Sequence, residues 1–412
     1  MKILLLLLIV LATIGARAAP DSAGANLPPV RAITAFVRLD PASYQGQISE
    51  ALEVLRQAKA EFALRGYQVE TLRIVTQPLA ELSRGLSEDR AYSLLQEIDR
   101  MSAREDFLPD IGPAMLTDAD DPAPMHLLAR ALSTLPRINA SVIIAADDGI
   151  HWQTIREAAK LLQQVTEHSP NSQGSFNFTA TAMLAPYGPF YPGAYHTGAG
   201  KQFSLGFEGA NVVQQVFAAS QGNFDLSVRE LTRHLQTHVD VGEAVGLAVA
   251  KVTHWQFMGV DPTPAPLGDA SIGDAIERYT GGKFGDSGTM TAALAITSAV
   301  KAVKGKTVGY SGLMLPVMED KRLAERWAEN SYDIDSLLAY SAVCGTGLDT
   351  VPLPGDVSED RLVHILGDVA ALAWKWHKPL SARLLPIKGK KPGDRSEFAS
   401  PYLFNTTLHA ER

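Results

Sequence analysis

The sequence predicts an α/β protein built as a single large domain. Segments with the alternation or the short apolar run of a β-strand are followed, along the whole chain, by segments with helical spacing of apolar residues. That order is typical of a large, mainly buried sheet or barrel covered by helices. No internal repeat or low-complexity linker divides the 412 residues, of which 46% are hydrophobic and 20% are charged. This composition is that of an ordinary globular protein with a full core.

The first half of the chain predicts strands separated by helices. The strands are alternating or continuous apolar segments: Val30–Arg38, Tyr67–Val75, Ala140–Ala145, Ser175–Leu184 and Phe203–Phe207. The helices have apolar residues at helical spacing: Gln47–Arg65, Asp89–Arg104, Met125–Thr134 and Trp152–Glu167. Gly66 follows the first helix, in the position where glycine commonly ends one. The segment Pro109–Pro124 is rich in turn residues and predicts a loop.

The second half predicts mostly helices and two late strands. The helices again have apolar residues at helical spacing: Ala210–Ala219, Leu226–Thr237, Gly242–Gln256, Ser271–Thr280, Thr289–Val303 and Ser358–His377. The strands are Leu348–Leu353 and Ser381–Ile387. The proline-rich run Pro262–Pro266 predicts a stiff, extended crossing segment. The polar tail Lys388–Arg412 is predicted to wrap over the surface.

Charge and the N-terminus bear on partners and location. A net charge of −8 argues against a nucleic-acid partner and against a polybasic membrane-surface role. Lys2, the apolar run Ile3–Ile14 and the Ala16-Arg17-Ala18 signal predict a signal peptide over residues 1–18. Cleavage near Ala18 would leave a leader over 19–29, a domain over 30–412, and an exported, periplasmic or secreted protein with no membrane anchor. An uncleaved anchor is the alternative.

The only cysteine lies in an unusual stretch, Thr307–Asp356. Asp333 or Asp335 can cap a helix that Gly345 ends, which places Cys344 on the tight loop Cys344–Gly347 between a helix and a strand. A single cysteine cannot form an internal disulfide. The thiol is therefore either a buried, inert side chain or a reactive group presented by the loop.

A rigid aromatic loop, Pro186–His196, is the second unusual stretch. Tyr191, Tyr195 and His196 supply hydroxyl groups and an imidazole, which suits a small-ligand pocket. The alternative is that the tyrosines cover the end of a sheet. Glu208 follows a predicted strand and is a candidate acid or base, or else it only complements a helix dipole.

The glycine-rich segment Gly281–Thr289 precedes a helix. Backbone N–H groups at a helix start bind anions, so Asp286, Ser287 and Thr289 are candidate ligand-binding residues. The segment lacks the ending of a nucleotide-binding loop, and a plain helix cap is the alternative. No metal site is predicted.

Several motifs together resemble a known family: Gly309–Asp320, Cys344–Asp349, Phe190–His196 and Arg383–Pro386. The chain is similar in these to the domain-of-unknown-function 711 family, also called uncharacterised protein family 0210. The resemblance implies a ten-stranded α/β barrel similar to pyruvate formate-lyase and anaerobic ribonucleotide reductase, and a homodimer. It also implies that Cys344 occupies an inward loop.

The resemblance does not imply radical chemistry here. A glycyl radical at Gly309 is disfavoured because that glycine lies far from the C-terminus and precedes Cys344. Export would also separate the protein from a cytosolic activating enzyme. No cofactor and no glycyl radical are therefore predicted.

These observations together predict an exported, non-radical enzyme. Cys344 would act as nucleophile or thiol acid/base, with His196 as base and Glu208 or Asp349 orienting it. The Gly345 and Gly347 amides would bind an oxyanion, and Tyr191 and Tyr195 would contact the substrate. A small polar, amino-acid-like metabolite and hydrolytic or lyase chemistry are expected. The alternative is a periplasmic small-ligand-binding protein without turnover.

Overall fold

The strands form one sheet of ten strands in the computed structural model, which describes residues 27–266 and 269–410. The order is β8-β7-β1-β2-β3-β4-β6-β10-β9, and β5 pairs with β4 outside this path. The strands are β1 Val30–Phe36, β2 Val69–Pro78, β3 Leu108–Gly112, β4 Asn139–Ala146, β5 Gly149–Ile150, β6 Phe178–Ala182, β7 Gln202–Phe207, β8 Gln256–Asp261, β9 Gly347–Pro354 and β10 Leu380–Ile387. The predicted ten-stranded α/β architecture in a single domain is confirmed.

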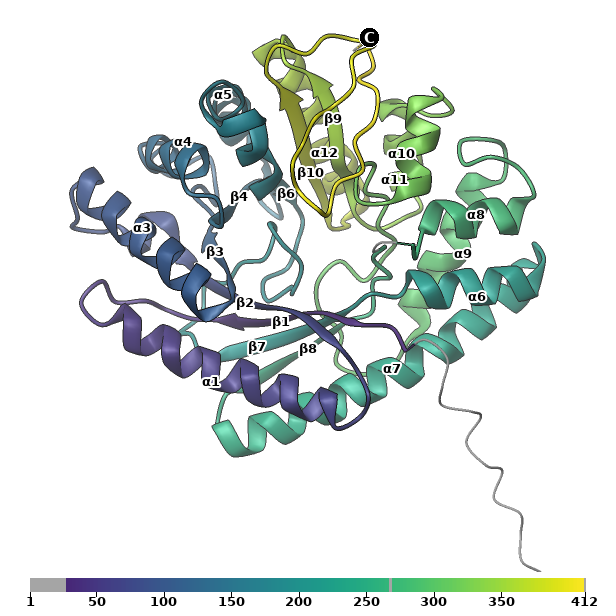
Figure 1. The fold of residues 1–412 in the computed structure, drawn as a ribbon, viewed down its shortest axis with the longest axis horizontal. Helices are drawn as coiled ribbons and strands as arrows, with labels where there is room; N and C mark the ends of the chain where they lie inside the picture. Colours follow the sequence, from purple (N-terminus) through teal and green to yellow (C-terminus); the bar gives the residue numbers. More distant parts are fainter. Residues whose placement is uncertain (1–26, 267–268, 411–412) are drawn as a thin grey trace, which may run out of the picture.

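The sheet curves around the middle of the molecule, with the helices outside it (Figure 1). Strands β1, β2, β3, β4 and β6 are parallel to one another. The pairs β7–β8 and β10–β9 flank them in the antiparallel direction. The end strands β8 and β9 do not pair with each other in the described part of the chain. Strand pairing therefore does not close the sheet into a complete barrel.

A central segment, residues 307–318, spans the gap between the end strands. Its first residue, Thr307, bridges Val260 of β8, and its Pro316 bridges Asp349 of β9. The buried Asp261 carboxylate accepts hydrogen bonds from the backbone of this segment, at Tyr310 N and Ser311 N. The central segment is thus fixed to β8 and β9 inside the curve of the sheet.

Helices cover the outer face and connect most of the strands. They are α1 Tyr44–Ala63, α2 Leu79–Leu82, α3 Glu88–Glu105, α4 Pro124–Thr134, α5 Trp152–His168, α6 Ala210–Ser220, α7 Phe224–Thr253, α8 Ile272–Thr280, α9 Thr289–Ala302, α10 Lys321–Ala328, α11 Ile334–Ser341 and α12 Glu359–Trp376. The Asp333 side chain accepts from Ser336 N and caps α11, so of the two predicted caps Asp333 is the one used.

The two helices predicted over 226–256 are one helix, α7, in the structure. The break predicted between Thr237 and Gly242 does not occur. Gly242 lets the helix lie close to the sheet, because a Cβ there would come within 3.0 Å of the Phe207 ring. Gly246 has the same role, since its Cβ would be 2.5 Å from the Phe257 ring. These glycines serve packing and not termination.

Strands β3 and β8, together with the two-residue β5, were not found by the sequence patterns. Strand β3 overlaps the start of the predicted loop Pro109–Pro124. Its Pro109 and Asp110 are residue types typical of turns, although β2 and β4 both pair with the strand. Strand β8 directly follows α7, and its Gly259 has φ 141° and passes Lys306 so closely that a Cβ would lie 2.4 Å from its carbonyl oxygen. Both strands are defined by their neighbours more than by their own residues.

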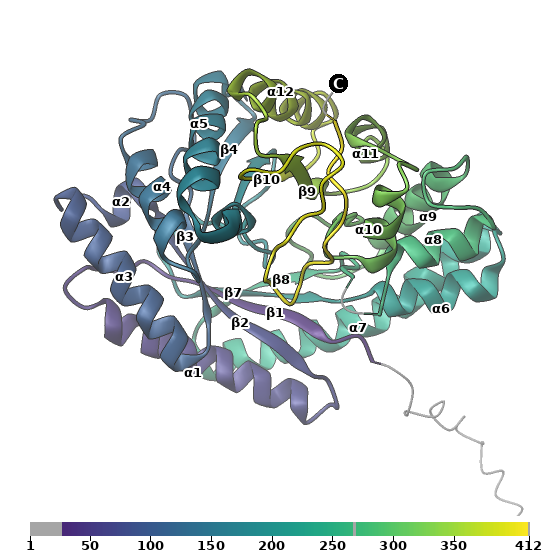
Figure 2. The same cartoon turned by 45° about the horizontal axis from the view of Figure 1, so that its top comes forward.

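The C-terminal tail crosses the surface beside α10, as predicted (Figure 2). Phe404 N donates to the Met318 carbonyl oxygen, and Thr406 Oγ1 donates to the Ala324 carbonyl oxygen. The predicted signal peptide lies outside the described residues. Within the described residues, no helix is both long and apolar enough to cross a membrane.

Candidate functional site

A cavity of about 360 Å³ lies inside the curve of the sheet, a size suited to a small ligand. Its charged lining comes from four strands, β1, β2, β9 and β10, and from the residue after the central segment: Arg31, Glu70, Arg73, Glu319, Asp349 and Arg383. Its apolar lining includes Phe176, Phe190, Ala265, Pro266, Met314 and Pro316. Charged groups enclosed beside apolar walls interact more strongly than they would in water.

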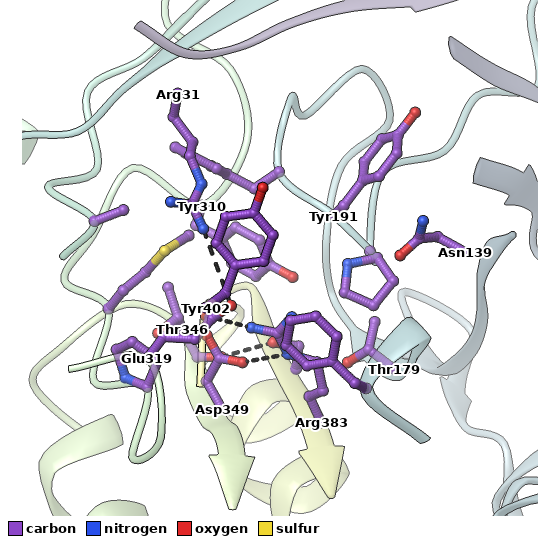
Figure 3. Close-up of a pocket in the computed structure, with 18 of the residues that line it drawn as sticks. Arg31, Asn139, Thr179, Tyr191, Tyr310, Glu319, Thr346, Asp349, Arg383 and Tyr402 are labelled. Atoms are coloured by element: carbon purple, nitrogen blue, oxygen red, sulfur yellow. Dashed lines mark hydrogen bonds and ion pairs between the residues drawn. The ribbon is translucent and has the colours of Figure 1, made fainter. Parts of the chain in front are cut away.

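Two arginines and three cavity carboxylates form a connected ion-pair network. Arg383 Nη2 is 2.6 Å from Glu319 Oε2, and Arg383 Nε is 2.7 Å from Asp349 Oδ1. Arg31 Nη2 lies 4.0 Å from Glu319 Oε1, and Arg31 Nη1 lies 3.7 Å from Glu70 Oε2. Figure 3 shows Arg31, Glu319, Arg383 and Asp349 joined by these contacts. The network links the first strand, β1, to the last, β10.

Glu208 adds a fourth carboxyl group to this network. It follows β7, is 3% exposed and accepts a hydrogen bond from Arg31. Burial raises the pKa of Glu208 to about 9, and the neighbouring Glu70 adds to this effect against the opposing charge of Arg31. One guanidinium is shared by Glu208, Glu70 and Glu319, so the most buried of the three carboxyls holds a proton at neutral pH. Glu70 and Glu208 therefore form a proton-sharing pair whose Glu70 member faces the cavity.

Arg73 lines another part of the cavity and has different partners. Its Nε donates to Thr71 Oγ1 at 2.9 Å, and its guanidinium carbon lies 4.7 Å from the centre of the Tyr191 ring. Burial, together with Arg31, lowers the pKa of Arg73 to about 10. The guanidinium still carries its charge at neutral pH.

The predicted partnership of Cys344 with His196 is not formed. Cys344 is 1% exposed, packs within the main hydrophobic core and does not line the cavity. Burial raises the pKa of the Cys344 thiol, although Lys378 nearby opposes this. A thiol enclosed in the core with a raised pKa is a poor nucleophile. The inert alternative for this cysteine fits the structure, and the reactive one does not.

His196 lies away from the carboxyl groups predicted to orient it. Its Nε2 bonds the Val37 carbonyl oxygen at 2.9 Å, and its ring packs against Phe36. Val37 directly follows β1, whereas Arg31, which bonds Glu208, lies near the start of that strand. The binding partners of His196 and Glu208 are therefore separated by about 20 Å of extended chain. Burial lowers the pKa of His196 to about 4. A neutral, buried imidazole outside the cavity cannot be the predicted base.

The remaining predicted residues divide between the cavity and other places. Tyr191 and Asp349 line the cavity. Thr346, between the predicted Gly345 and Gly347, lines it as well, whereas the two glycines do not.

Tyr195 and the glycine-rich segment lie outside the cavity. Tyr195 donates to the Leu184 carbonyl oxygen at 2.7 Å. In the glycine-rich segment, Asp286 accepts from Lys283 N and Thr289 Oγ1 accepts from Gly285 N, while Ser287 is exposed. The segment leads into α9, and none of its three predicted ligand-binding residues lines the cavity.

The sequence reasoning missed most of the charged cavity residues. Arg31, Arg73 and Arg383 each lie between two apolar residues of a strand. A charged residue inside a strand buried on both faces needs a partner within the fold, and this pattern was the available signal. In the described residues, no three His, Cys, Asp or Glu side chains are grouped so that they could hold a metal ion.

Comparisons with known proteins find relatives along almost the whole chain. The profile of the family described as "Uncharacterised ACR (DUF711)" matches residues 25–400. A "UPF0210 protein" of Pyrobaculum arsenaticum is 30% identical over 90% of this chain and 88% of its own. One from Actinobacillus succinogenes is 27% identical over 81% of this chain and 77% of its own. Among solved structures, the anaerobic ribonucleotide reductase from Thermotoga maritima in complex with dATP and CTP aligns with a TM-score of 0.42 at 7% identity, covering 86% of this chain and 75% of that chain.

Proposed function

The chain belongs to the DUF711 family, and from the cavity we propose that it is an enzyme performing acid–base chemistry on a small polar metabolite. The observation that carries the proposal is the Glu70–Glu208 pair. Glu70 faces the cavity, and the buried Glu208 beside it has a pKa of about 9. A carboxyl group with a pKa raised in this way is typical of a catalytic proton donor.

The pair is suited to hydrolytic or lyase chemistry, in which a proton must move at the substrate. Glu70 accepts a proton from a bound group, and Glu208 holds a proton that reaches the cavity through the hydrogen bond between the two. The Arg31 guanidinium, in contact with both, stabilises whichever of them is ionised. The chemistry needs no radical and does not use Cys344.

The test compares turnover by wild type, Glu70→Gln and Cys344→Ala. Each purified protein is incubated with a small-molecule extract of the host cell, and mass spectrometry follows which compounds are consumed. Wild type should consume a defined compound, and Glu70→Gln should do so at least about 100-fold more slowly because its amide cannot take a proton. Cys344→Ala, which changes a core residue outside the cavity, should keep the wild-type rate. Equal rates for Glu70→Gln and wild type would refute the acid–base role of Glu70.

A small-ligand-binding protein without turnover is the second candidate. The arginines that hold Glu319 and Asp349 in fixed positions favour it, since a preorganised polar cavity also suits binding alone. The same incubation distinguishes the two, because a binding protein retains a compound that is recovered unchanged.

We further propose that the protein is exported and forms a homodimer. Lys2 and the apolar run before Ala18 support export. The measurement is N-terminal sequencing and light scattering of protein purified from its source: a start at Met1 argues against cleavage, and a monomer mass argues against the dimer.

A further inference from the structure

We propose that the ligand of this cavity is a small organic carboxylate and that Arg73 binds its carboxylate group. The inference rests on the proposed function in that it uses the same cavity. It concerns only what is bound there, and it involves a different residue from the proton-sharing pair.

The Nε and Nη1 atoms of Arg73 are held by protein groups, and its Nη2 atom is available to a ligand. It is 5% exposed on β2, with Nε bonded to Thr71 Oγ1 and Nη1 3.4 Å from the Pro189 carbonyl oxygen. The Tyr191 ring packs against the guanidinium plane. Within the described residues its Nη2 has no hydrogen-bond partner, although the side chain lines the cavity. The fork is therefore preorganised for an acceptor that enters from the cavity.

The other two cavity arginines already have carboxylate partners, and Arg73 does not. Arg31 contacts Glu208 and Glu70, and Arg383 contacts Glu319 and Asp349. Among the described residues, no carboxylate oxygen lies within 4.0 Å of an Arg73 nitrogen. A buried guanidinium without a counter-ion is costly, and an anionic ligand would offset that cost.

Asp110, a buried carboxyl group whose pKa is affected by the charge of Arg73, does not supply the missing charge. It is fully buried on β3, and neither of its oxygens has a hydrogen-bond partner. Burial raises the pKa of Asp110 well above its ordinary range, against the opposing charge of Arg73. Burial thus favours the uncharged form of Asp110, whose oxygens make no hydrogen bond to Arg73, so the guanidinium remains available to a ligand.

The surroundings favour a carboxylate on a small organic body over phosphate. A single planar fork and a single free positive charge match one carboxylate, whereas phosphate sites usually gather several donors around a larger charge. The side chain of Thr179, 2% exposed and lining the cavity, has a hydroxyl without a partner. Figure 3 shows Thr179 and Asn139 on the same side of the cavity as Tyr191. A ligand bound to Arg73 can thus place a polar substituent against Thr179 and its body against Phe176 or Phe190.

The experiment compares acids with their primary amides. Lactate, glycine and succinate are titrated into the wild-type protein by calorimetry at pH 7, beside lactamide, glycinamide and succinamide, with inorganic phosphate as a further probe. At least one acid should bind, and its amide should bind at least about 30-fold more weakly, because the amide loses the charge-assisted contact with Arg73. Arg73→Gln should weaken the same acid by a similar factor, and Arg73→Lys by less. Arg229→Gln, at an exposed position of α7, is the matched control and should bind as wild type does.

Three results would overturn the proposal. They are the absence of any acid-over-amide preference across the panel, binding of phosphate in place of every carboxylate, and unchanged acid affinity in Arg73→Gln. The acid–amide comparison uses wild type alone, so it decides the question even if an Arg73 variant does not fold. Glu70→Gln separates this inference from the proposed function: it should bind the acid at least as tightly as wild type, because one negative charge of the cavity is removed, while turnover falls. Full turnover by Glu70→Gln would end the acid–base proposal and leave the carboxylate site standing.

Discussion

Gly312→Ala should destabilise the protein by about 3 kcal/mol or more, the largest stability effect we expect from a single methyl group. Gly312 in the central segment and Gly345 in the loop before β9 pass each other backbone to backbone. A Cβ on Gly312 would lie 2.3 Å from Gly345 Cα and 3.0 Å from Gly345 N. Neither contact is with a flexible side chain, so relief requires moving one of the two loops. The loss is measured as the change in the free energy of unfolding in urea.

Gly46→Ala is the matched control for this substitution. Gly46 lies in α1, and a Cβ there would have no atom within 4 Å. Alanine in that helix should be neutral or stabilise by up to about 1 kcal/mol. If Gly312→Ala were within about 1 kcal/mol of wild type, the central segment would be able to move away from Gly345. The rigid placement of Tyr310 and Met314 in the cavity wall would then be refuted.

Glu208→Gln should reduce turnover by about 100-fold or more while leaving the fold intact. At pH 7 Glu208 is protonated, so glutamine closely imitates it: the amide oxygen still accepts from Arg31, and the amide N–H₂ can donate to Glu70. What the amide lacks is a transferable proton. The measurement is the rate of substrate consumption at pH 7, with the urea midpoint as the check that folding is unchanged.

The same pair sets the pH dependence of the wild-type rate. A proton donor is active only when protonated, so the rate should hold below pH 9 and fall as the pH rises through the Glu208 pKa of about 9. Because Glu70 and Glu208 share a proton, this alkaline limb belongs to the pair and not to one residue. In Glu208→Gln the residual rate should lack the limb. A residual rate that still falls near pH 9 would assign the limb to another group.

Much of the fold could be predicted from the sequence because most elements carry their own pattern. Strand β1 and helix α12, for example, show the expected apolar runs and spacing. Strands β3 and β8 could not be found in this way, since they are short and owe their extended shape to the strands beside them. The continuity of α7 depends on how near it packs to Phe207 and Phe257, which no local pattern encodes.

The site was predicted less completely, and for a related reason. Tyr191 and Asp349 were selected for their chemistry and do line the cavity, and Glu208 lies beside it. Cys344 and His196 were also selected for their chemistry. Residue type alone does not reveal that Cys344 is enclosed in the core or that His196 bonds the backbone just after β1. Which side chains meet in a curved sheet depends on register and direction, and these follow from the three-dimensional pairing.

Glu319 is held between Arg31 of the first strand and Arg383 of the last. During synthesis, the Arg31 end of this ion-pair network is therefore made long before the Arg383 end. No intermediate that lacks the final strand can enclose the cavity, however much of its helical layer has formed. Ligand binding would consequently report on completed folding of the whole chain, and a protease cut anywhere between the two arginines that let the pieces separate would abolish it.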